Sequence, residues 1–82
     1  MQPILEIDLH GLTAAQAQIK IEAAVRTAPK SVYRIRCIHG YHGGVRIREM
    51  IRREFGYGLE PRVLRIEMGS NEGITELVLR EY

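Results

Sequence analysis

Two strand-like segments of this chain end in the same dipeptide, and a helical pattern follows each of them. The first, residues 4–9, runs into His10-Gly11, and the second, residues 32–38, runs into His39-Gly40. Parallel strands joined by a crossover helix finish at the same edge of their sheet. Ligands usually bind at that edge in open α/β sheets. The repeated unit therefore predicts a strand–helix–strand core whose two histidines face one crevice.

Four segments alternate apolar and polar residues, and this period of two predicts β-strands. They are residues 4–9, 32–38, 63–68 and 74–80. Each has one apolar and one charged face, which is typical of a sheet that helices cover on one side only. The charged faces carry both signs, which favours paired charges on a solvated surface. These charged residues are Glu6, Asp8, Arg34, Arg36, Arg65, Glu67, Glu76 and Arg80.

Two stretches between the strands carry apolar residues at helical spacing. Thr13 and the glutamine three residues later have the spacing of a capping box, which predicts the start of the first helix. Pro29 ends that helix. The second helix is predicted over residues 45–55, and Gly56 suits its C-terminal end.

The length of 82 residues suits one small domain with its own core, over residues 1–82. No linker or shift in composition divides the chain. The elements follow in the order βαβαββ. The sequence therefore predicts a two-layer α+β sandwich, in which a four-stranded mixed sheet carries two helices on one face.

The charged residues are biased toward arginine. The net charge is only +2, but ten of the twelve cationic residues are arginine, which binds phosphate bidentately and stacks on bases better than lysine does. The single cysteine, Cys37, cannot form an intrachain disulfide and is expected in the core. No apolar run approaches membrane-spanning length, so we expect a cytoplasmic protein without membrane contact.

Glycines accompany the two histidines. If the third predicted strand runs parallel to the first two, most of the glycines gather at one rim, where they let a ligand approach the backbone closely. No capping side chain immediately precedes the second helix, so its first N–H groups are free for a phosphate. The alternative is that these glycines only permit tight turns. The residues are Gly11, Gly40, Gly43, Gly44, Gly69 and Gly73.

Acidic and imidazole side chains fall at the same rim. Asp8 and His10 are two residues apart in an extended segment, so they project from one face, where the carboxylate can orient the imidazole. His39 ends the neighbouring strand, and His42 lies in the loop after it. Two imidazoles around one phosphate suit acid–base hydrolysis. The alternative is that each histidine only hydrogen-bonds a loop carbonyl.

The same four side chains include a two-histidine–carboxylate donor set. Because no helical spacing fixes them, we do not expect a tight structural metal site. The sequence indicates no certain cofactor. A loosely held divalent cation, shared with phosphate, remains an alternative.

The second helix carries four arginines that can follow a nucleic-acid backbone. Tyr41, in the loop before it, can stack on a base or pack over the sheet edge. Glu49 and Glu54 dilute the positive field and pair with arginines at helical spacing. The four arginines are Arg46, Arg48, Arg52 and Arg53.

These motifs resemble those of the Smr (small MutS-related) domain family. Residues 7–13, Ile-Asp-Leu-His-Gly-Leu-Thr, resemble the Leu-Asp-Leu-His-Gly motif that opens that domain. Ile38-His39-Gly40 and the glycines after it resemble its second motif, His-Gly-x-Gly-x-Gly. The turn from Gly69 to Gly73 resembles its third, glycine-containing segment. The resemblance spans essentially the whole chain, with departures at Tyr41 and His42.

The resemblance implies a fold similar to the C-terminal domain of translation initiation factor three. It also implies binding of DNA or RNA, with nicking or endonuclease activity that hydrolyses phosphodiesters. Carried over to this chain, Asp8 and His10 are the cleavage-linked residues, and the loop over residues 39–44 positions phosphate. A non-catalytic DNA- or RNA-binding module is the first alternative. A binder of a small phosphorylated ligand or of a protein is another, and the chain is expected to be a monomer or a weak dimer.

Overall fold

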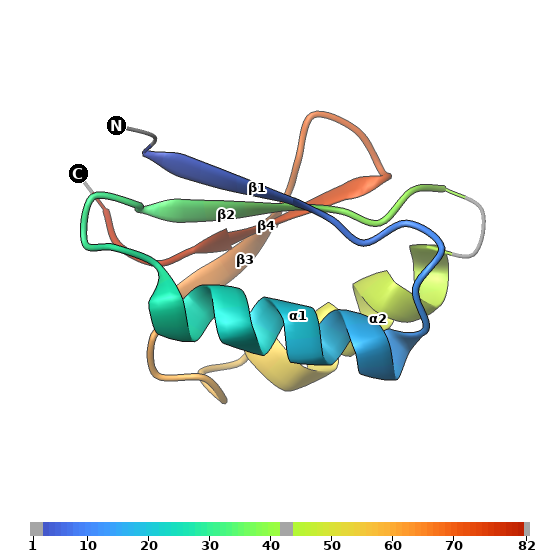
Figure 1. Cartoon of the computed structure of the whole chain (residues 1–82), viewed down its shortest axis with the longest axis horizontal. Helices are drawn as coiled ribbons and strands as arrows, with labels where there is room; N and C mark the ends of the chain where they lie inside the picture. Colours follow the sequence, from blue (N-terminus) through green and yellow to red (C-terminus); the bar gives the residue numbers. More distant parts are fainter. Residues whose placement is uncertain (1–2, 42–43, 82) are drawn as a thin grey trace.

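The computed structural model describes residues 3–41 and 44–81. Four strands and two helices alternate along the chain and form two layers, a sheet and a pair of helices on one of its faces (Figure 1). In chain order the elements are β1 (Ile4–Asp8), α1 (Ala14–Thr27), β2 (Arg34–Ile38), α2 (Gly44–Phe55), β3 (Arg65–Met68) and β4 (Ile74–Val78).

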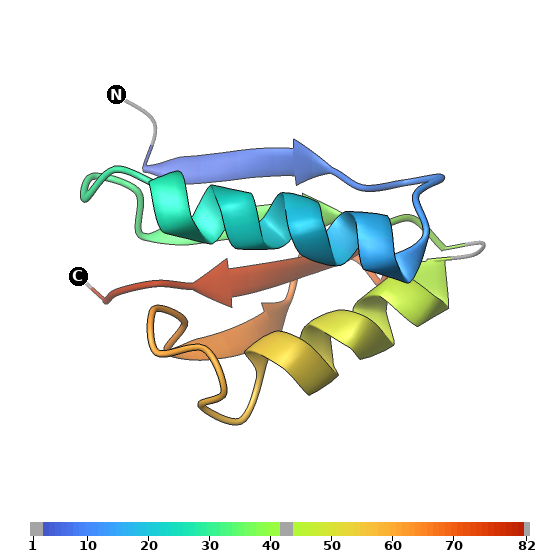
Figure 2. The same ribbon diagram turned by 60° about the horizontal axis from the view of Figure 1, so that its bottom comes forward.

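The sheet is mixed, with the strand order β1-β2-β4-β3. β1 and β2 are parallel, whereas β4 runs antiparallel to both of its neighbours, β2 and β3. β3 therefore runs in the same direction as β1 and β2. This is the direction that the predicted gathering of glycines at one edge of the sheet requires. Figure 2 shows α1 over the β1–β2 side of the sheet and α2 toward β4 and β3. The predicted two-layer α+β fold is confirmed.

The predicted capping box starts α1. The N–H of Gln16 donates to the Thr13 hydroxyl (3.1 Å), and the N–H of Thr13 donates to the Gln16 side chain (3.0 Å). These two bonds satisfy donors that the first turn of a helix leaves open. The helix ends at Thr27, before Pro29. It buries a narrow stripe of small and branched side chains, Ala17, Ile21 and Val25.

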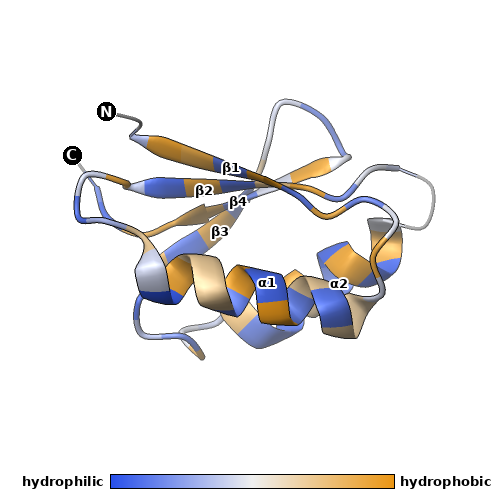
Figure 3. Cartoon of the chain, viewed as in Figure 1, coloured by the Kyte–Doolittle hydropathy of each residue, from blue (hydrophilic) through white to orange (hydrophobic). Residues whose placement is uncertain are grey.

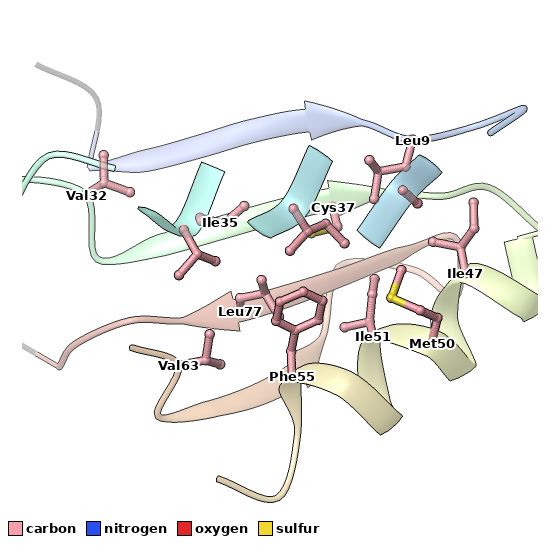
Figure 4. Close-up of a cluster of buried hydrophobic side chains, with 13 residues drawn as sticks. Leu9, Val32, Ile35, Cys37, Ile47, Met50, Ile51, Phe55, Val63 and Leu77 are labelled. Atoms are coloured by element: carbon pink, nitrogen blue, oxygen red, sulfur yellow. The ribbon is translucent and has the colours of Figure 1, made fainter. Parts of the chain in front are cut away.

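The core lies between the sheet and the helices. Strands alternate apolar and polar residues along their length (Figure 3), and the apolar side chains point toward α1 and α2 (Figure 4). Val32 and Val63 were predicted in strands but lie in turns just before β2 and β3, where their N–H groups bond Pro29 and Glu60. Both are still buried. Other core residues include Leu9, Ile35, Cys37, Ile47, Met50, Ile51, Phe55 and Leu77.

The face of the sheet away from the helices carries the predicted charge pairs. Arg34 donates to Glu76 (2.5 Å) and Glu67 (3.0 Å), and Arg36 donates to Glu76 (2.8 Å). Burial alone would raise the pKa of Glu76, but the two arginines outweigh it and the pKa lies below its usual value. Further ion pairs to Glu6 and Arg65 extend the network to both edge strands. This face is therefore internally neutralised.

The end of α2 differs from the prediction. Gly56 follows the helix, but its backbone does not adopt the left-handed conformation that favours glycine at a helix end. That conformation falls on Tyr57 (φ 58°) and Gly58 (φ 76°). Gly56 is needed for space, because a Cβ there would lie 2.6 Å from the carbonyl oxygen of Arg52. The chain thus holds a tyrosine where few residues other than glycine are found.

No helix within residues 3–41 and 44–81 is long and apolar enough to cross a membrane.

Candidate functional site

The ends of β1 and β2 and the turn after β3 meet at one rim. The N–H of Leu9 donates to the carbonyl of Ile38 (2.7 Å), which extends the pairing of the two parallel strands. The N–H groups of His39 and Gly40 both donate to the carbonyl of Gly73 (2.9 and 3.0 Å), in the turn between β3 and β4. The predicted convergence of three strand-end segments is confirmed.

Two glycines of the rim are required by the backbone. Gly11 and Gly40 have φ values of 79° and 82°, which side chains strongly disfavour. A Cβ on Gly73 would lie 3.3 Å from the Cα of Gly40, so these two turns pack closely. Gly69 has a different role, because a Cβ there would collide with Ile74 of its own hairpin. Gly69 is therefore explained by packing alone.

Asp8 and His10 form an exposed pair at the rim. Nδ1 of His10 lies 2.5 Å from Oδ1 of Asp8, and the backbone N–H of His10 donates to the same oxygen (3.1 Å). Because a carboxylate only accepts, Nδ1 carries the proton and Nε2 of the neutral ring keeps its lone pair. The side chain of His10 is 73% exposed, and that of Asp8 is 56% exposed. Among the described residues, none forms a hydrogen bond with Nε2 of His10.

The same two bonds set the charge of the pair. The ring and the backbone N–H of His10 hold the pKa of the Asp8 carboxyl below its usual value. Asp8 is therefore ionised at neutral pH and keeps the imidazole in one tautomer and orientation. Lys20 of α1 donates to the backbone carbonyl of Asp8 (3.0 Å), which ties the end of β1 to the helix layer.

His39 lies at the rim, but it is buried and both of its ring nitrogens have partners within the chain. The prediction of a second exposed imidazole in the crevice is therefore wrong. His39 is only 2% exposed. Nδ1 lies 3.1 Å from the carbonyl oxygen of Gly40, and Nε2 lies 2.8 Å from the hydroxyl of Thr75. Burial lowers the pKa of His39, the bond to Gly40 raises it, and the nearby charge of Arg48 lowers it again, so the net shift is downward. A neutral ring that donates at Nδ1 and accepts at Nε2 satisfies this geometry.

The alternation of the strands explains the difference between the two histidines. Side chains two residues apart in a strand share a face. His10 follows Asp8, whose side chain is exposed, whereas His39 follows Cys37, which is buried in the core. The catalytic assignment of His39 stays a prediction, and its contacts favour a role in positioning Gly40.

The first residue of α2 packs against His39. A Cβ on Gly44 would lie 2.6 Å from the backbone oxygen of His39 and 3.0 Å from its Nδ1. Beside this contact lies a small hollow of about 130 Å³. Its lining comes from the rim, from the first turns of α2 and from the turn between β3 and β4: His39, Gly40, Tyr41, Gly44, Val45, Arg48 and Glu72.

A larger hollow, of about 340 Å³, runs between α2 and β3. It shares Arg48 and Glu72 with the small one, so the two hollows adjoin. Apart from Val45, the residues of α2 and its C-terminal end that line them recur every fourth position, which places them toward one side of the helix. This stripe is Gly44, Arg48, Arg52 and Gly56.

The four predicted arginines of α2 divide into two pairs. Arg48 and Arg52 line the hollows, and among the described residues neither forms a salt bridge. Arg46 and Arg53 are exposed and line neither of them, and Arg53 pairs with its neighbour Glu54 (3.0 Å). The structure therefore brings only half of the predicted basic set to the two hollows, and only Arg48 lines the hollow at the rim.

Of the other predicted residues that the structure describes, one lines the small hollow and the rest do not. Tyr41 is 58% exposed and lines the small hollow beside Gly40. Gly11 is exposed in the turn after His10. His42 and Gly43 lie outside the described residues. Cys37 is buried as expected, and burial raises the pKa of its thiol to about 12, so it is not a nucleophile.

Sequence reasoning missed the far wall of the larger hollow. Ile66 and Met68 come from β3, and Tyr57 closes the end beyond α2. The fourfold spacing of the α2 stripe was present in the sequence and indicated a single lining face. Nothing in the sequence indicated that β3 would lie opposite that face, because the pairing of β3 with β4 decides its position.

No group of three or more metal-ligating side chains gathers among residues 3–41 and 44–81. The proposed donor set included His42, which is not among them. A loosely held divalent cation therefore stays a prediction.

No protein-family model and no curated protein matches the sequence. Among solved structures, the chain is similar to the Smr domain of Thermus thermophilus MutS2. The two share 28% sequence identity, and the match covers 94% of this chain and 99% of that domain, with a TM-score of 0.80.

Proposed function

The chain belongs to the Smr domain family, and from this premise we propose that it binds DNA or RNA at the rim beside His10. The observation that carries the proposal is the stripe on α2. It places two guanidinium groups, those of Arg48 and Arg52, along adjoining hollows that begin at Gly40. Arginine binds phosphate bidentately, and a polyanion needs such groups in a row.

The rim offers a second feature that suits a phosphate. Gly40 brings backbone close to His10, since a Cβ on this glycine would lie only 3.9 Å from the Cβ of His10. Gly44 places the start of α2 at the same point, where the helix dipole favours a negative group. A phosphate next to Gly40 would therefore lie between Arg48 and the His10 ring.

The Asp8–His10 pair supports a further step, hydrolysis of the phosphodiester. His10 accepts a proton at Nε2 from the attacking water as the new P–O bond forms. The bond to the leaving oxygen breaks, and that oxygen takes a proton from solvent water to leave as an alcohol. Asp8 stabilises the imidazolium that results. Such acid–base catalysis contributes about 10²- to 10⁴-fold to the rate. In this scheme His39 holds the Gly40 loop and does not touch the substrate.

Cleavage is tested with supercoiled DNA and with structured RNA, each with and without added Mg²⁺ or Mn²⁺. The wild-type chain should produce nicked DNA or RNA fragments, and His10→Ala should not. Asp8→Asn should slow the reaction less, because the imidazole remains. If the wild-type chain leaves every substrate intact, the hydrolytic step is rejected.

Binding is tested separately, because the chain can be a non-catalytic DNA- or RNA-binding module. The logarithm of the affinity should fall linearly with the logarithm of the salt concentration. Arg48→Ala and Arg52→Ala should each weaken binding and reduce that slope. Arg46→Ala is the matched control, since it removes the same charge from the other side of the same helix. Equal effects of all three substitutions, or binding that salt does not change, would contradict the proposal.

A further inference from the structure

The larger hollow has two unlike walls. One wall is the α2 stripe with Arg48 and Arg52, and the other is the apolar side of β3 with Ile66 and Met68. Tyr57 stands at the end of the hollow and is 83% exposed, and Met68 is 71% exposed. These two side chains line one hollow together with Ile66, Arg48 and Arg52, and an exposed apolar patch bordered by polar residues is typical of an interaction site.

From these walls we infer that the larger hollow binds a single-stranded segment of nucleic acid, with its phosphates on the α2 arginines and its bases against Met68 and Tyr57. The inference rests on the proposed function and names the form of nucleic acid that the site takes. The strand would run from the His10 rim, past Gly40 and Arg48, to Tyr57.

A single strand fits both walls, whereas a duplex fits only one. In a duplex the base faces are stacked on each other, so its surface offers phosphates to arginine but no flat apolar face to the β3 wall. An unpaired strand offers both, and aromatic side chains bind its bases by stacking without regard to sequence. Tyr57 is held at φ 58°, in a conformation that few non-glycine residues adopt, with its ring in solvent.

Two acidic residues, Glu67 and Glu72, also line the larger hollow. Glu67 accepts from Arg34 (3.0 Å) and Arg65 (2.7 Å), so arginines outside the hollow neutralise it. Glu72 lines both hollows and, among the described residues, forms no salt bridge. A phosphate that passes from one hollow to the other must pass this carboxylate. Glu72→Gln should therefore tighten binding of a nucleic-acid strand.

The length of α2, which borders both hollows, sets the length of strand that can follow them. Helix α2 has 12 residues, which is about 18 Å at about 1.5 Å per residue. A stacked strand that advances about 3.4 Å per nucleotide would follow this helix over about five nucleotides. Affinity should therefore rise with length up to about that number and then level off.

The test uses fluorescein-labelled thymidine and uridine homopolymers, measured by fluorescence anisotropy at one salt concentration. Mixed-sequence strands are measured alone and annealed to their complements. The wild-type chain should bind single strands at least about tenfold more tightly than duplexes. Tyr57→Ala should weaken single-strand binding about tenfold, in keeping with the loss of one stacked base. Duplex binding should not change.

Two control variants separate stacking from loss of structure. Tyr57→Phe keeps the ring and should bind like the wild type. Leu59→Ala removes another exposed apolar side chain, which is 64% exposed and lines a different hollow, and should change nothing. Circular dichroism of each variant checks the fold.

The variant Glu72→Gln removes the negative charge between the two hollows, so it should bind single strands several-fold more tightly than the wild type.

The possible failures are distinct. If the chain binds nucleic acid through Arg48 and Arg52 but treats single strands and duplexes alike, or if Tyr57→Ala changes neither, this inference is wrong and the proposed function stands. If Glu72→Gln weakens binding, the hollow does not hold phosphates and the inference is equally wrong. If no oligonucleotide binds, the proposed function fails as well.

Discussion

His10 and His39 follow neighbouring parallel strands with the same dipeptide, yet their environments are opposite. His10 is exposed and its Nδ1 lies against the Asp8 carboxylate, which leaves Nε2 toward solvent. His39 is buried, and both of its ring nitrogens have partners within the chain. One ring is therefore placed to meet a ligand and the other to hold the loop that meets it.

The strand order supplies part of the reason for the difference. β1 is an edge strand, whereas β2 lies between β1 and β4. The ring of His39 therefore has Thr75 of β4 within reach, and α2 starts over it at Gly44. A repeated motif thus does not imply a repeated role. What decides the role is the face of the strand and the neighbours on each side.

Replacement of His10 should give the largest effect on activity and almost none on folding. We expect His10→Ala to lower the cleavage rate at least about 100-fold, because acid–base catalysis by one side chain contributes that much. The free energy of unfolding should stay within about 0.5 kcal/mol, as for most surface substitutions. Nicking assays and urea titration measure the two quantities. A large loss of stability would place His10 in the core with His39.

Replacement of His39 should lower stability strongly and activity only weakly. His39→Ala removes a buried ring and leaves the Thr75 hydroxyl without its acceptor, so we expect unfolding to become easier by about 3 kcal/mol. Urea titration followed by circular dichroism measures this change. Activity per folded molecule should fall far less than in His10→Ala. If His39→Ala is as stable as the wild type but inactive, then His39 takes part in the chemistry.

The partner of His39 provides a smaller and cleaner perturbation. Thr75→Val keeps the shape of the side chain but leaves Nε2 of His39 without its donor, at a cost of about 1–2 kcal/mol in stability. Thr75→Ser retains the hydroxyl and is the matched control. An equal loss of stability in both variants would mean that the threonine methyl group, and not the hydrogen bond, stabilises the rim.

Stability should depend on pH through His39. Its pKa lies below the ordinary value of 6.5 in the folded chain. Between the folded pKa of His39 and pH 6.5 the unfolded chain therefore binds a proton that the folded chain does not bind. This contribution to stability is present above pH 6.5 and is lost as the pH falls through the folded pKa of His39. Urea titrations at several pH values should show a slope in this window for the wild type and a weaker slope for His39→Gln. Equal slopes would contradict a buried neutral ring.

The sequence was sufficient for the fold and for the convergence of β1 and β2 at the rim. Alternation in the strands, the Thr13 capping box and the stop at Pro29 are local signals, and the structure follows them. The neutralised outer face also agreed. These features depend on period and on short-range chemistry, which a single sequence carries. The direction of β3, in contrast, was a condition of the rim argument that only the structure supplied.

The site was less predictable, because its parts come together through tertiary packing. The burial of His39 was readable from its alternation with Cys37 but was hidden by the match of the two dipeptides. Helix geometry explains why Arg48 and Arg52 line the hollows while Arg46 and Arg53 do not, but only once the side of α2 that borders the hollows is known. Tyr57 and Met68 had no signal, because the end of α2 and the place of β3 beside it bring them to the hollow only in the folded chain.

The most direct test of the contrast between the two rings is an NMR titration with a short thymidine strand. The imidazole signals are assigned with His10→Gln and His39→Gln variants. We predict that the His10 signals shift progressively as the strand is added, while the His39 signals barely move and keep the pattern of a ring protonated at Nδ1. Large shifts at His39 with a silent His10 would contradict the account.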